Sequence, residues 1–194
     1  YWPYGIGFVN GRFIVTDTGN RRVMVWHGLP EPEQPPAFIM GQDGPDKGLE
    51  NRGRGVGPDT YRWPHAVAGN DDILYMADAG NHRLLGWTPP PDNDRPADVV
   101  LGQPDFSRAS EWPYGQQGPS ALRFPYAIAL ENDLLACADT ANNRILLWQG
   151  LPAKEHFRPA DGVLGQPNFE QNGENRWQSV ARDTPCWPYG IHLH

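Results

Sequence analysis

The sequence has little of what would mark several common protein classes. Two cysteines among 194 residues cannot build a framework of several disulfides. They do not indicate whether the protein resides in a reducing or an oxidising compartment. Lys47 and Lys154 are the only lysines, and the formal net charge is −7. Non-specific binding to nucleic acid or to an anionic membrane requires a dense cationic face, which this balance does not favour.

Long apolar runs are also absent. None approaches the roughly 20 residues that a membrane-spanning helix needs. The first residues contain no basic stretch and no cleavable signal pattern, so no targeting segment is predicted. The localisation therefore stays unknown. Glycine and proline are abundant but interspersed with tryptophan, tyrosine and valine, which is typical of turn-rich β structure rather than of a disordered tract.

A threefold internal repeat dominates the sequence. In each copy an apolar run ends in aspartate, a small polar turn follows, and a second apolar run begins at arginine and ends in tryptophan. The copies cover 13–26, 74–87 and 135–148, with their aspartates 61 residues apart. Repeats of this length indicate one structural unit per period.

Four short apolar segments make up each period. The first follows an aromatic-Pro pair, the next two form the repeated stretch, and the fourth ends in Gly-Gln. Proline at the start of a strand removes no ladder hydrogen bond, and Asn10-Gly11 between apolar runs is a strong hairpin signal. Four antiparallel strands per period are typical of a β-propeller blade.

The pattern AD-x-GN-x-R, preceded by P-x-G-I or P-x-A-V, resembles the NHL-repeat family over nearly the whole chain. The third copy departs from it, with Ala141 in place of glycine. The resemblance implies an all-β propeller in one domain over 1–194, often six-bladed, that presents binding surfaces. Some relatives are enzymes with a metal in the central channel. The expected blades are about 2–42, 63–103 and 124–166, with the first strand of a fourth at 187–194.

Three blades do not close a ring, because propellers usually have about four to eight. Either a second copy supplies the missing blades, or the sequence is a fragment of a longer propeller. In a ring of two chains, residues 187–194 would compete with residues 2–8 of the other chain for one position. We therefore favour the fragment, with the remainder of the same propeller closing the ring.

Two polar positions recur in every blade and are expected to be structural. The aspartates should accept hydrogen bonds from amides of the following turn, and the arginines five residues later should brace the same turn. They are Asp17, Asp78 and Asp139, and Arg22, Arg83 and Arg144.

The candidate ligand site lies at the start of the innermost strands. The residue after each strand-opening proline should face the channel mouth, where its polar group would contact a ligand. These residues are Tyr4, His65, Tyr126 and Tyr189. No catalytic residue is assigned, since the sequence contains no nucleophile elbow, P-loop or dinucleotide fingerprint.

Metal binding is the weaker alternative at this position. His65, His192 and His194 are the candidate ligands for zinc or calcium, but a zinc site needs three or four converging ligands. We expect no cofactor. His27, His82 and His156 fall in predicted turns or loops, where we expect them to be solvated.

Clustered arginines in the first long link, Arg52, Arg54 and Arg62, could bind phosphate or RNA, although the net negative charge argues against a nucleic-acid partner. The leading hypothesis is a non-enzymatic propeller scaffold that binds a protein or a small ligand. The alternative is a metal-dependent lyase or lactonase-like hydrolase with its site in the central channel.

Overall fold

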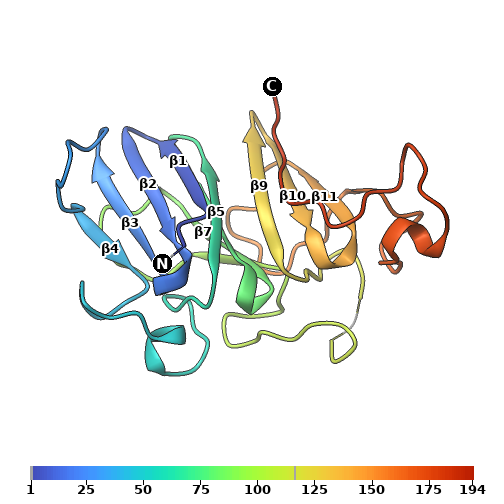
Figure 1. Cartoon of the computed structure of the whole chain (residues 1–194), viewed down its shortest axis with the longest axis horizontal. Coiled ribbons are helices and arrows are strands. Elements are labelled where there is room, and N and C mark those ends of the chain that lie inside the picture. The colour runs from blue at the N-terminus through green and yellow to red at the C-terminus, as the bar shows by residue number, and fades with distance from the viewer. Residues whose placement is uncertain (1, 116) are drawn as a thin grey trace.

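A computed structural model describes residues 2–115 and 117–194. Within them the chain forms three four-stranded antiparallel sheets and contains no α-helix (Figure 1). None of these residues lies in a helix long and apolar enough to cross a membrane.

The strands of the first sheet are β1 (Gly5–Val9), β2 (Arg12–Asp17), β3 (Arg22–His27) and β4 (Phe38–Met40). Those of the second are β5 (Pro64–Gly69), β6 (Leu74–Asp78), β7 (Arg83–Trp87) and β8 (Val99–Leu101). Those of the third are β9 (Pro125–Glu131), β10 (Leu134–Asp139), β11 (Arg144–Gln149) and β12 (Gly162–Leu164).

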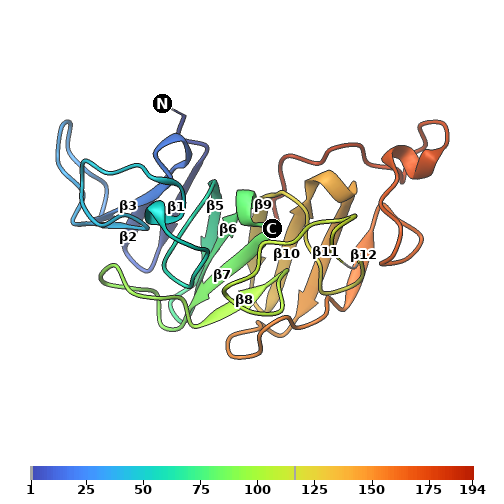
Figure 2. The same cartoon turned by 90° about the horizontal axis from the view of Figure 1, so that it is seen from below.

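The sheets are arranged as neighbouring blades around a common side. Each follows the chain order from its first to its fourth strand, and the first strand of the middle sheet, β5, contacts both β1 and β9. Figures 1 and 2 show the sheets standing side by side, with β1, β5 and β9 toward the shared side and β4, β8 and β12 toward the periphery. The predicted fold class, an all-β propeller with four-stranded antiparallel blades, is confirmed.

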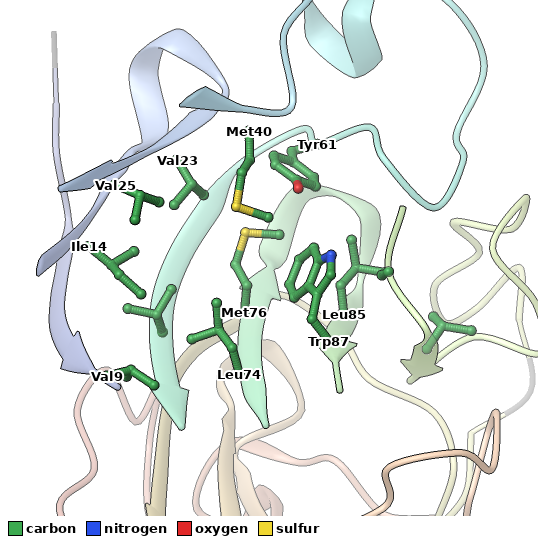
Figure 3. Packing of buried hydrophobic residues seen from close by; sticks show 13 residues of the cluster. Val9, Ile14, Val23, Val25, Met40, Tyr61, Leu74, Met76, Leu85 and Trp87 are labelled. Atoms are coloured by element: carbon green, nitrogen blue, oxygen red, sulfur yellow. The ribbon is translucent and has the colours of Figure 1, made fainter. Parts of the chain in front are cut away.

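The core lies between successive blades. Ile14, Val23 and Val25 of the first blade face Met76 and Trp87 of the second, all of them buried (Figure 3). An equivalent cluster joins the second blade to the third. The strands of the second blade are therefore apolar on both faces, and each buried Val, Leu or Ile side chain contributes about 1.5–3 kcal/mol relative to exposure.

The repeated turn after the second strand differs in one detail from the prediction. Asp78 Oδ1 accepts the backbone N–H of Arg62 (2.9 Å), which precedes the first strand, and Oδ2 accepts Asn81 Nδ2 (2.7 Å) and Arg83 Nε (2.9 Å). Among the described residues, no backbone amide of the following turn donates to the Asp78 carboxylate; the turn contributes the side-chain amide of Asn81 instead. The aspartate thus joins the first, second and third strands of a blade, and the predicted bracing by arginine is found. Blades one and three repeat the Asn and Arg contacts.

The long links are ordered by a glutamine that lies two residues after each fourth strand. Gln42 Nε2 donates to Arg21 O and Leu49 O, both at 2.9 Å, and so ties the link to the preceding turn. Gln103 and Gln166 make the equivalent pairs of bonds. Residues 112–115 of the second link form a turn, as expected despite their likeness to a first strand.

Residues 187–194, predicted as the first strand of a fourth blade, do not lie in a β-strand. They form no ladder with another described strand. They are held against blade three instead. Thr140 Oγ1 donates to Pro188 O at 2.7 Å, and Trp187 N–H donates to Asn143 Oδ1 at 2.9 Å.

Candidate functional site

The four residues predicted at the channel mouth form one column of rings. Tyr4 stacks on His65 with ring centroids 4.4 Å apart, and His65 stacks on Tyr126 at 4.2 Å. Tyr126 then meets Tyr189 at 5.1 Å. Each ring comes from a different period of the repeat, so the column follows the shared side of the blades. The structure thus brings together all four predicted residues.

Local bulges aim two of these rings. In the second blade Pro64 pairs with Asp78 and Ala66 with Ala77, which leaves His65 as the extra residue. In the third blade Tyr126 is the extra residue between two such pairs. A bulge bends its strand and redirects a side chain. The position after proline therefore leaves the sheet plane and joins the column instead of a blade-to-blade core.

A cavity of about 610 Å³ opens beside this column. Its walls are mainly aromatic, and the turn Thr18–Asn20 with the neighbouring Arg21 closes one side. The residues lining it are Trp2, Tyr4, Thr18, Gly19, Arg21, Trp63, His65 and Tyr126. Large amphipathic rings beside a few polar groups are the usual composition of small-molecule sites. Trp2, Trp63 and Arg21 also line the cavity, although the sequence did not predict them as site residues.

Burial sets the charge state of the column. It lowers the pKa of His65 to about 4, so the imidazole is neutral at pH 7. It raises the pKa of Tyr126, and the neighbouring Tyr189 and Tyr4 raise it further. The column therefore offers neutral hydroxyl and imidazole groups, which donate and accept hydrogen bonds without a fixed charge.

The predicted metal candidates do not gather around one point. His65 lies between the rings of Tyr4 and Tyr126, while His192 and His194 stack on each other with centroids 5.7 Å apart. Across the described parts of the chain, no group of three or more His, Cys, Asp or Glu side chains is placed to hold a metal ion. The residues present do not fit a zinc or calcium site, and the metal prediction stays a prediction without geometric support.

The arginines considered for RNA are engaged in ion pairs. Arg52 contacts Asp43 (2.9 Å) and Asp94 (2.6 Å), and Arg54 contacts Asp59 (2.6 Å). Arg62 lies 3.3 Å from Glu50. All three arginines thus have carboxylate partners, and a phosphate group would have to compete with those carboxylates for them.

The expectation of a solvated His82 is wrong. Its side chain is buried, its Nδ1 accepts the N–H of Phe124 at 3.3 Å, and its Nε2 lies 3.7 Å from Glu111. Burial lowers its pKa, and the Glu111 carboxylate only partly offsets this. His82 follows the repeated turn, and the next blade covers it there. Local sequence contains no signal for that contact.

Comparison with known proteins supports the architecture alone. No family model matches the chain. No curated protein matches it. A crystal structure of a nidogen/laminin complex is similar over 98% of this chain and 51% of that chain, with 16% identity and a TM-score of 0.52.

Two enzymes are more distantly similar. Virginiamycin B lyase from Staphylococcus aureus has 17% identity and a TM-score of 0.44, over 87% of this chain and 43% of that one. Glutaminyl cyclase from Myxococcus xanthus has 13% identity and a TM-score of 0.45, over 94% and 53%. At these scores neither enzyme bears on function. The chain spans about half the length of these structures, and it belongs by fold to the β-propellers.

Proposed function

We propose that this chain is part of a non-enzymatic binding propeller of the NHL-repeat kind, which holds a small ligand or a segment of a protein partner at the channel mouth. The observation that carries the proposal is the column from Tyr4 to Tyr189 beside an aromatic cavity of about 610 Å³. Three stacked blades hold the rings in place, so little ordering entropy is lost when a ligand enters.

The lining suggests how recognition would work. Trp2 and Trp63 supply apolar ring surface, while the hydroxyls of Tyr4 and Tyr126 and the neutral imidazole of His65 supply uncharged hydrogen-bonding groups. Arg21 is the one cation among the lining residues. Such a wall favours a flat or ring-shaped, neutral or weakly anionic ligand, because the rings supply stacking surface and the charged lining residue is a cation.

The proposal includes further blades beyond the three described here. Thr18 Oγ1 donates to Pro64 O at the junction of blades one and two, and Thr140 Oγ1 donates to Pro188 O in the same way. Residues 187–191 repeat the sequence of residues 2–6, WPYGI. The chain thus begins a blade of the first type at the position where a fourth blade belongs. The mass of the intact native polypeptide tests this point, since a natural chain of only three blades would contradict it.

The ligand site can be tested by saturation-transfer NMR with a library of small aromatic and carbohydrate fragments. We expect fragments whose transfer is lost in His65→Ala and retained in Tyr114→Ala, a control whose ring is 90% exposed and outside the cavity. Far-UV circular dichroism must be unchanged in both variants. Equal loss in both, or no hit in the wild type, would count against the site.

The enzymatic alternative predicts a different result. If the intact protein turned over a substrate, and His65→Ala abolished that turnover without changing the fold, the non-enzymatic proposal would be wrong. Elemental analysis of the purified protein is the companion measurement, for which we expect no stoichiometric zinc or calcium.

A further inference from the structure

One position of the repeat changes its chemistry from blade to blade. The residue that follows each repeated turn has a left-handed backbone, with φ of 56°, 55° and 52° at Arg21, His82 and Asn143. His82 Nδ1 accepts the N–H of Phe124 at 3.3 Å, and Asn143 Oδ1 accepts the N–H of Trp187 at 2.9 Å. At these two positions a side-chain acceptor thus joins one period to the start of the next.

Arginine breaks this arrangement at the junction of blades one and two. A guanidinium group has donors only, so Arg21 cannot accept the N–H of Trp63, which occupies the position of Phe124 in the repeat. Phe124 and Trp187 have left-handed backbones with φ of 48°, and Trp63 does not. The cation therefore comes with a different course of the chain just before the first strand of blade two.

The same junction is filled in one case and open in the other. Between blades two and three, the His82 ring packs at 83° to Phe124 with the centroids 4.4 Å apart. Between blades one and two, the equivalent residues Arg21 and Trp63 line the aromatic cavity of about 610 Å³. Both residues belong to described blades, and the difference in filling follows from the residue after the turn.

The Arg21 guanidinium is held in place but keeps an unused edge. Its Nη1 donates to the carbonyls of Gly19 and Gly48, at 3.1 and 3.0 Å. Its Nε is buried, and neither Nε nor Nη2 has a hydrogen-bond partner among the described residues. No described carboxylate forms an ion pair with Arg21, whereas the next residue, Arg22, contacts Asp17 at 2.7 Å. Nε and Nη2 form the edge to which a carboxylate binds with two parallel hydrogen bonds.

This combination favours an anionic group beside a ring. A partly buried cation without a counter-ion carries a desolvation cost, which a carboxylate that enters the cavity offsets. Ring surface lies next to it in the indole of Trp63, which is held by Phe124, with centroids 6.0 Å apart, and by the guanidinium of Arg62 at 5.1 Å. The site therefore has a fixed aromatic wall and a donor edge that the protein itself leaves unpaired.

We propose that the cavity binds a planar ligand that carries a carboxylate, with the carboxylate on Arg21 and the ring against Trp2 and Trp63. A free aromatic acid and the C-terminal residue of a peptide both supply this chemistry. The volume of about 610 Å³ is in the range of small-molecule sites. The inference rests on the proposed function, because it names the ligand class of the same site.

The test compares two probes that differ in one charge, N-acetyltryptophan and its neutral amide, by saturation-transfer NMR titration. We expect the acid to bind the wild type about tenfold or more tightly than the amide, since a hydrogen bond to a charged group is worth at least that ratio. Arg21→Asn should raise the dissociation constant of the acid to that of the amide. Asparagine is the residue of blade three at this position, where it adopts the same left-handed backbone.

The matched control is Arg108→Asn, which removes the same charge from a side chain that is 65% exposed and does not line the cavity. It should leave the ratio of the two affinities unchanged. Far-UV circular dichroism should match the wild type for each variant, and Arg21→Gln takes the place of Arg21→Asn if that variant is not folded.

A glycine-rich peptide that ends in tryptophan, with its carboxylate free or amidated, separates the two sources of the ligand. We expect the free form to bind more tightly than the amidated one. Tighter binding of the free peptide than of N-acetyltryptophan supports a chain terminus as the ligand, and weaker binding supports a free acid.

Three results would overturn the inference: equal affinities of acid and amide for the wild type, a preference for the acid that persists in Arg21→Asn, or equal losses in Arg21→Asn and Arg108→Asn. The proposed function would survive them as long as fragments bind the wild type and are lost in His65→Ala. If no fragment and neither probe binds the wild type, both proposals fail.

Discussion

The repeat places one ion pair in different environments, which allows a prediction with an internal control. The side chains of Asp78 and Arg83 are both 0% exposed, whereas those of Asp17 and Arg22 in blade one are 11% and 17% exposed. The Asp–Arg contact is otherwise alike, at 2.9 and 2.7 Å. The same Asp→Ala replacement at the two sites therefore removes the same contact from two environments that differ in burial.

We expect Asp78→Ala to lower the free energy of unfolding by about 3–5 kcal/mol, because it leaves the Arg83 guanidinium buried without its counter-ion. The Arg62 N–H and the Asn81 amide also lose an acceptor. Asp17→Ala should cost only about 1–2 kcal/mol, since water reaches the Arg22 guanidinium that loses its counter-ion.

Urea unfolding monitored by tryptophan fluorescence measures both variants at the same protein concentration. Domains of this size have about 5–15 kcal/mol in total, so the first variant is marginal and the second is comfortably folded. Asp139→Ala repeats the experiment at a pair that is again 0% exposed. Equal losses for Asp17→Ala and Asp78→Ala, with unchanged denaturant slopes, would refute the argument from burial.

Two further outcomes follow from burial and from backbone conformation. The pKa of His65 lies at about 4 in the fold and near 6.5 when unfolded, so its neutral form stabilises the protein above pH 6.5 and this contribution is lost as the pH falls toward 4. The gap is worth about 3 kcal/mol at full burial, reduced by partial exposure to about 1–2 kcal/mol. Unfolding at a series of pH values should show a shallower decline for His65→Phe; an unchanged slope would contradict the assignment, while His82 contributes in the same direction in both proteins. Gly102→Ala should cost about 2–3 kcal/mol, because φ is +90° and a Cβ would lie 2.7 Å from Leu122. Gly55→Ala, with open space around it, is the control, and equal melting temperatures would count against this reasoning.

Sequence alone determined the repeat, the four strands of each blade and the residues of the turn. These features are local, since apolar alternation, turn residues and proline positions act within a few residues of the chain. The spacing of the three copies then placed Tyr4, His65, Tyr126 and Tyr189 in equivalent positions, and equivalent positions in a radial stack meet at its axis.

Only the tertiary structure decided which polar groups are covered. His82 is buried by the blade that follows it, Arg52 meets Asp94 from the neighbouring blade, and the bulge at His65 turns its ring into the column. All of these depend on contacts between residues far apart in the chain, whose geometry is fixed only once whole blades pack against one another.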